Sequence, residues 1–78
     1  LPGGSIGVFE LEVLEGAPAT EHVLANLPLP SQCLIAAVIR DSYVRVPGAD
    51  DHLRPGETVI ALIEDSVVED SVRQFSVG

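Results

Sequence analysis

The sequence predicts a small α+β domain in which a mainly antiparallel sheet packs with helices in the order β-α-β-β-β-α. Three patterns lead to this prediction. Residues 8–15 and 43–46 nearly alternate between apolar and polar side chains, as half-buried strands do. Residues 33–39 are apolar throughout, which is typical of a strand covered on both sides. An apolar i, i+4, i+7 stripe near the C-terminus indicates a docked helix; its members are Val68, Val72 and Phe75.

The first strand is expected to turn its apolar residues to the core and its carboxylates, Glu10 and Glu12, to water. Residues 16–18, Gly-Ala-Pro, break the strand. Thr20 is then expected to cap a short helix of about two turns, which Pro28 ends. This helix separates the first strand from the apolar run that forms the centre of the sheet.

The central strand is expected to lead through a hairpin turn at Asp41 and Ser42 into a strand whose Val44 and Val46 face inward. Residues 47–56 are rich in turn formers and predict a loop with one apolar residue, Leu53, tucked beneath it. Pro55-Gly56 suits a type II turn, and residues 58–63 form the last strand. The terminal helix is expected to begin with a capping box; its two residues are Ser66 and Glu69.

The chain has 78 residues, 46% of them hydrophobic, so it can build one core and one domain. Residues 1–7 are expected to form a flexible leader and residues 8–78 the domain. A lone core of this size supplies about 3 to 5 kcal/mol, so self-association is the first candidate source of further burial. Because the chain starts at Leu1 with a loose segment, we expect a fragment of a longer protein.

Twelve acidic residues stand against four arginines and no lysine, which gives a net charge of -8. This field repels phosphate backbones and anionic lipid, so it disfavours general binding to nucleic acid or membrane surfaces. The single cysteine, Cys33, lies within the apolar run and is expected to be a small buried hydrophobe in a reducing compartment. No apolar stretch is long enough for a membrane helix, and no signal peptide is recognisable, so a soluble chain is expected.

The sequence offers no convincing catalytic or metal-binding constellation. Residues 50–52, Asp-Asp-His, match no zinc or calcium spacing and predict a solvated acidic loop. No nucleophile elbow is present, and Cys33 is expected to be buried within a strand. The glycines at 3, 4 and 7 form no dinucleotide fingerprint, since no strand precedes them. We therefore expect no catalytic residues, no metal and no cofactor.

The scarce arginines are the best candidates for ligand contact. Arg40 ends the central strand, Arg45 lies in the next one and Arg54 in the loop. An arginine at a strand end beside a turn can offer a planar fork to a phosphate or carboxylate. The alternative is a surface salt bridge to Asp41 or to a neighbouring glutamate.

Six pieces of the chain, in order, resemble the TrkA-C domain, which is also the C-terminal lobe of the RCK regulator of potassium conductance. The resemblance covers roughly residues 8–75. The pieces are Phe9-Glu10-Leu11-Glu12-Val13, Leu27-Pro28-Leu29-Pro30, Ile35-Ala36-Ala37-Val38-Ile39-Arg40, Val46-Pro47, Leu53-Arg54-Pro55-Gly56-Glu57 and Phe75. Departures from the family pattern, which often has glycine or Gly-Asp there, occur at Ala19-Thr20-Glu21, Asp41-Ser42 and Gly56-Glu57.

The resemblance implies an α+β domain that forms homodimers on the cytosolic side of potassium channels, Trk or Ktr uptake gating subunits and cation/proton antiporters. Such domains accompany a nucleotide-binding RCK lobe of the same parent chain or a membrane transporter or channel subunit. Some relatives bind cyclic di-AMP between the two copies, and others respond to cations. Carried over by position, the ligand-binding residues are Ile39, Arg40, Asp41, Val46 and Pro47.

The function that follows is that of a non-catalytic regulatory domain, cytoplasmic and tethered to or associated with an inner-membrane transporter. A ligand that binds one arrangement of the dimer better would shift the population towards it, and the attached transporter would respond. Two alternatives remain open. The chain could be a pure assembly module that dimerises without a ligand, or a small enzyme with a carboxylate or Cys33 of strongly perturbed acidity in a cleft.

Overall fold

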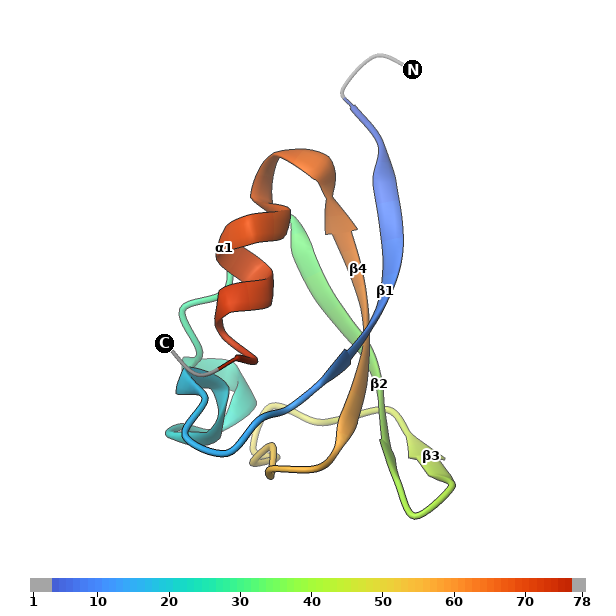
Figure 1. The fold of residues 1–78 in the computed structure, drawn as a ribbon, viewed down its shortest axis with the longest axis vertical. Coiled ribbons are helices and arrows are strands. Elements are labelled where there is room, and N and C mark those ends of the chain that lie inside the picture. Colours follow the sequence, from blue (N-terminus) through green and yellow to red (C-terminus); the bar gives the residue numbers. More distant parts are fainter. Residues whose placement is uncertain (1–3, 77–78) are drawn as a thin grey trace.

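A computed structural model describes residues 4–76 of the chain and contains one four-stranded sheet with the strand order β1-β4-β2-β3 (Figure 1). Every paired strand is antiparallel, as predicted. The strands are β1 (Ile6–Glu12), β2 (Cys33–Arg40), β3 (Tyr43–Arg45) and β4 (Thr58–Glu64). The α-helix is α1 (Val68–Arg73), and 3₁₀ turns occupy Pro18–Thr20, Leu24–Asn26 and Asp65–Val67.

The helical elements lie on one side of the sheet (Figure 1), and the core packs between them and the sheet. The main core cluster joins residues from the sheet, the loops and the C-terminal segment: Val13, Ala19, Leu27, Ile35, Val38, Leu53, Val59 and Phe75. A second cluster of Cys33, Ala61 and Ile63 packs beneath α1 through the half-buried Val68. Cys33 is therefore the buried hydrophobe that its position predicts.

The alternation of the first strand is confirmed, because Phe9 and Leu11 pack against the core while Glu10 and Glu12 are exposed. The strand nevertheless begins earlier than residue 8: Ile6 pairs with Glu64 of β4. The predicted leader at residues 1–7 is thus partly strand, and residues 1–3 of it lie outside the described residues.

The apolar run at residues 33–39 lies in β2, which is an inner strand, as predicted. In a single copy of the chain, however, only one face of this strand is covered. Leu34 of β2 is 60% exposed. The strand also contains a β-bulge, because the pairing with β4 shifts between Ile35 and Ala37. A bulge inserts one extra residue and reverses which face the following side chains occupy. Consequently Ile35 and Val38 are both buried, three positions apart.

The bulge explains why the inward orientation expected for Val44 and Val46 is wrong. Val44 is paired with Ile39, which the bulge moves to the open side of the sheet, and Val44 is 60% exposed. Val46 lies beyond β3 and is also exposed. The half-buried residue of β3 is Arg45, which pairs with the buried Val38.

The short helix expected after Thr20 is absent from the described residues and is replaced by two 3₁₀ turns, Pro18–Thr20 and Leu24–Asn26. Thr20 does not cap a helix, since its hydroxyl donates to the carbonyl of Ala17. The amides of Leu24 and Ala25 donate to carbonyls of the 47–56 loop instead of to carbonyls of a preceding helical turn. Tertiary partners therefore replace helical hydrogen bonds in a segment too short to sustain a helix alone.

Around the sheet, the remaining turn predictions hold and one capping prediction does not. Asp41 and Ser42 form the hairpin turn, and Leu53 is buried beneath its loop. Gly56 has the positive φ, +89°, that a type II turn requires. The capping box is wrong, because the 3₁₀ turn Asp65–Val67 precedes α1 and the helix has no side-chain cap.

Candidate functional site

The candidate ligand-binding residues surround the β2–β3 hairpin, but they do not form one wall. Ile39 is half-buried and pairs with Val44 on the open side of the sheet. Arg40 is the next residue of β2 and pairs with Tyr43. Because successive side chains of a strand point to opposite faces, the side chain of Arg40 lies on the helix side of the sheet. The structure thus separates Ile39 from Arg40 across the sheet. Asp41 and Val46 are exposed, and Pro47 is half-buried.

The side chain of Arg40 reaches a buried carboxylate that sequence analysis did not select. Its Nε atom lies 3.4 Å from Oε2 of Glu57, whose side chain is only 2% exposed. Nη1 of Arg45 lies at the same distance from the same oxygen. The other carboxylate oxygen, Oε1, accepts a hydrogen bond of 2.7 Å from the backbone amide of Arg54. We call Arg40, Arg45 and Glu57 the Glu57 cluster.

Both the bulge and the type II turn are needed to build the Glu57 cluster. The bulge in β2 moves Arg40 to the helix side of the sheet, where Glu57 is buried just before β4. The turn at Gly56 directs Glu57 inward and lets its backbone amide donate to the carbonyl of Arg54. The sequence signal that could have found the cluster is the acidic residue after Pro-Gly in a chain with only four arginines.

Arg40 therefore forms a salt bridge to a glutamate, as the alternative interpretation expected. The partner, Glu57, is buried and distant in sequence rather than a neighbouring surface residue. Arg40 itself remains 46% exposed and Arg45 31% exposed. A second carboxylate, that of Asp51, lies 4.0 Å from Nε of Arg45. The Asp51 carboxylate also accepts a 2.7 Å hydrogen bond from the amide of Gly48.

The other side of the sheet presents an apolar surface with no element of the described chain lying over it (Figure 1). Val8, Leu62 and Leu34 form one cross-strand row, and Ile39 pairs with Val44 in another. Val8 is 72% exposed. We call this surface the open face; its residues are Val8, Leu34, Ile39, Val44, Ile60 and Leu62.

The acidic loop has structural partners. The ring nitrogen Nε2 of His52 lies 2.7 Å from the carbonyl oxygen of Thr20 and links the loop to the first 3₁₀ turn. Asp51 binds its own loop through Gly48. Within residues 4–76 no group of three or more His, Cys, Asp or Glu side chains could hold a metal ion.

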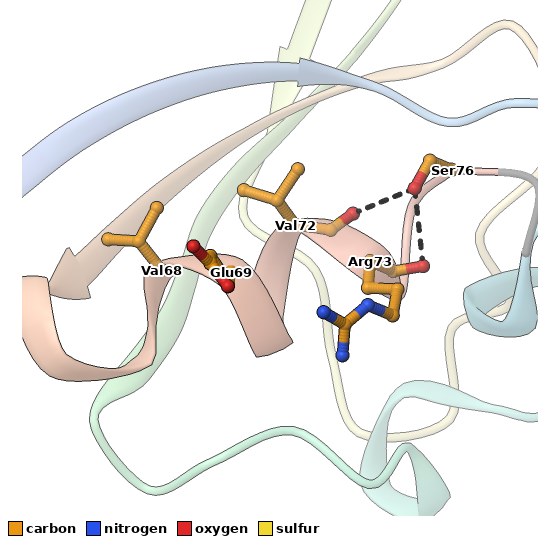
Figure 2. Close-up of a pocket in the computed structure, with 5 residues that line it drawn as sticks. All are labelled: Val68, Glu69, Val72, Arg73 and Ser76. Carbon is orange, nitrogen blue, oxygen red and sulfur yellow. Dashed lines mark hydrogen bonds between the residues drawn. The ribbon is translucent and has the colours of Figure 1, made fainter.

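A shallow hollow of about 360 Å³ lies over α1 (Figure 2). Figure 1 shows that α1 is distant from the β2–β3 hairpin. Two polar side chains of the hollow, those of Ser76 and Arg73, make local contacts. The hydroxyl of Ser76 donates to the carbonyls of Val72 and Arg73 as the helix ends. Nη1 of Arg73 lies 3.3 Å from Asp70. The remaining lining residues are Val68 and Glu69.

Comparison with known proteins gives three findings. A family model described as the TrkA-C domain matches residues 8–76. A Trk system potassium uptake protein TrkA homolog from Archaeoglobus fulgidus is 34% identical over 67 residues, which are 86% of this chain. The chain spans only 15% of that relative's length.

Among solved structures, one described as an RCK domain with cda superimposes with a TM-score of 0.74 at 22% identity. The match covers 88% of this chain and 97% of the other chain. This likeness establishes the RCK fold of the chain. None of the helices in residues 4–76 is both long enough and apolar enough to cross a membrane.

Proposed function

The chain belongs to the TrkA-C domain family, and from this premise we propose that it is a non-catalytic regulatory domain of a potassium or cation transport protein. In this proposal the domain pairs with a second copy and senses a small ligand between the copies. The curated relative is a potassium uptake protein several times longer than this chain, which supports a larger parent system. The partner is then a nucleotide-binding RCK lobe of the same parent chain or a transporter or channel subunit, with this domain on the cytoplasmic side.

The observation that carries the pairing is the open face. Monomeric proteins rarely leave a continuous apolar patch of several side chains in water, and here two inner strands contribute to one. A two-fold axis would place the same patch of each copy against the other. Glu10 and Glu12 of β1 flank the patch on one side. Because carboxylates of the two copies would repel each other there, we expect the copies to pack closely through the apolar rows instead.

The ligand is proposed to bind where the hairpins of the two copies meet. Arg40 lies on the side of the sheet opposite the open face, but at the hairpin end of β2, where its side chain is 46% exposed. The ligand is therefore proposed to sit at the rim of the interface, where it can contact both Arg40 and Ile39. An arginine guanidinium suits a phosphate oxygen, while the apolar side chains of Ile39 and Val46 suit the face of a base. Cyclic di-AMP fits this chemistry, and the solved relative described with cda supports testing it.

The test of pairing is the molar mass of the chain, measured by light scattering during gel filtration. The wild type is expected at about twice its 8.2 kDa mass. Leu34→Glu places a carboxylate within the open face, in one row with Leu62 and Val8, and is expected to give the monomer. The control variant is Leu14→Glu, a residue outside the open face that is also exposed. A wild type that remains monomeric at high concentration contradicts the pairing.

The test of ligand sensing is a thermal-shift titration with cyclic di-AMP, potassium and divalent cations. At 100 times its Kd, a ligand adds about 2.7 kcal/mol of stability, which raises the melting temperature measurably. Arg40→Ala is expected to remove the cyclic di-AMP shift and to leave the dimer intact. A dimer that none of these compounds stabilises favours the second candidate, a pure assembly module, which the open face supports equally well.

A further inference from the structure

Two of the four arginines in this acidic chain contact one buried carboxylate. They come from neighbouring strands and approach the same oxygen of Glu57, each at 3.4 Å. Two positive charges thus share one buried negative charge, in a chain whose net charge is -8. Arg45 also has the carboxylate of Asp51 at 4.0 Å, so Arg40 is the arginine of the cluster whose charge is less fully compensated. Such a cluster is the place in the molecule where an anion would meet positive charge already fixed in space.

The carboxylate of Glu57 is held rigidly. Its Oε1 atom accepts the Arg54 amide at 2.7 Å, its backbone amide donates to the carbonyl of Arg54, and its carbonyl accepts the amide of Val13. The residue is also among the fully buried side chains of the protein. The two backbone bonds fix the main chain of Glu57, and the Arg54 amide restrains Oε1, so the carboxylate keeps one orientation towards the arginines at Oε2.

The contact between Arg40 and Glu57 is an ion pair at the inner nitrogen of the guanidinium. Its Nε atom faces Glu57, and among residues 4–76 no other carboxylate lies within ion-pair distance of Arg40. The two terminal NH₂ groups carry four N–H donors, and the side chain is 46% exposed. An arginine held at Nε presents its outer edge as a fork that matches two oxygens of a phosphate.

We infer that Glu57 is a positioning residue of the anion site, which orients Arg40, with Arg45 as the second cation, towards a phosphodiester ligand. This inference rests on the proposed function, since it concerns the same ligand. The physical reason is preorganisation: a long side chain that is already immobilised loses less entropy when it binds. Glu57→Gln keeps the shape and the acceptor for Arg54 but removes the charge that holds both arginines.

The first measurement needs no ligand. In ¹⁵N-correlated NMR spectra of the 78-residue chain, the Nε–H proton of Arg40, which faces the buried carboxylate of Glu57, is expected to exchange with water more slowly than that of Arg73. Arg73 contacts only the exposed Asp70, and it does so through Nη1. Glu57→Gln is expected to abolish the slow exchange at Arg40. The matched control, Asp70→Asn, removes an exposed carboxylate from an arginine and leaves Arg40 unchanged. Equally fast exchange of both arginines in the wild type overturns the inference, even if Glu57→Gln does not fold.

The second measurement is the Kd of cyclic di-AMP by calorimetry, on variants whose folding is verified by the same spectra. Glu57→Gln is expected to weaken binding about tenfold, and Asp70→Asn to leave it unchanged. Equal affinities of wild type and Glu57→Gln overturn the positioning role while the proposed function stands. A wild type that binds no cyclic di-AMP overturns the ligand part of the proposed function, and the inference falls with it.

Discussion

The ring of Phe9 lies over Gly7 on β1, so close that a Cβ atom on Gly7 would stand 2.7 Å from Cε1 of the ring. Phe9 is half-buried and packs against the cluster of Cys33, Ala61 and Ile63. A glycine within a strand usually weakens the strand. Here the glycine makes room for an aromatic side chain to reach the core near the start of β1.

Gly7→Ala is therefore expected to lower the free energy of unfolding by about 1 kcal/mol, although alanine normally stabilises an extended backbone. The cause is displacement of the Phe9 ring. Urea denaturation measures the effect, and the double variant with Phe9→Leu provides the check. If the ring is the cause, Gly7→Ala lowers the free energy of unfolding less in the Phe9→Leu background than in the wild type. An equal decrease in both backgrounds contradicts the steric explanation.

Gly56→Ala is expected to destabilise the protein by about 1 to 2 kcal/mol, because φ at this residue is +89°. Space is not the obstacle, since a Cβ on Gly56 would meet no atom within 4 Å. Gly48 is the matched control: it has the same open surroundings without a positive φ. Gly48→Ala should change stability by less than about 0.5 kcal/mol. Similar effects at both glycines would show that backbone strain does not decide the outcome.

Ser42→Gly is expected to stabilise the hairpin by about 1 kcal/mol. Asp41 and Ser42 have φ values of 49° and 67°, the left-handed pair that a type I′ turn demands. Serine adopts this conformation at a cost that glycine avoids. Chemical denaturation of the two proteins in parallel is the measurement. Glycine also increases the conformational entropy of the unfolded chain, which favours unfolding. A variant less stable than the wild type would mean that this entropy outweighs the strain relieved at residue 42.

Phe75→Ala is expected to cost about 3 to 5 kcal/mol, comparable to the whole stability of so small a domain. Phe75 is buried in the main core cluster, and its carbonyl accepts the amide of Leu14. Tyr43→Ala removes an aromatic ring that is 69% exposed and should have an effect within about 0.5 kcal/mol. Near-native thermal stability of Phe75→Ala would contradict the position of this residue in the core.

The sequence alone is sufficient for the features that depend on local alternation and turn chemistry. The faces of β1, the turn at Asp41 and Ser42, the burial of Leu53 and the positive φ at Gly56 all follow from residues adjacent in the chain. The antiparallel α+β fold follows from their order. Each of these features requires only steric preferences and hydrophobic periodicity, which neighbouring residues express without help from distant ones.

The tertiary structure decided on which side of the sheet the candidate ligand residues lie. A single extra residue in β2, between Ile35 and Ala37, turns Ile39 and Val44 to the open face and sends Arg40 to Glu57. No local signal marks this bulge in a run of apolar side chains. It is set by the pairing of β2 with β4, and β4 lies more than twenty positions further along the chain. The register between β2 and β4 is fixed only when the two strands pair, and this register determines that Arg40 contacts Glu57.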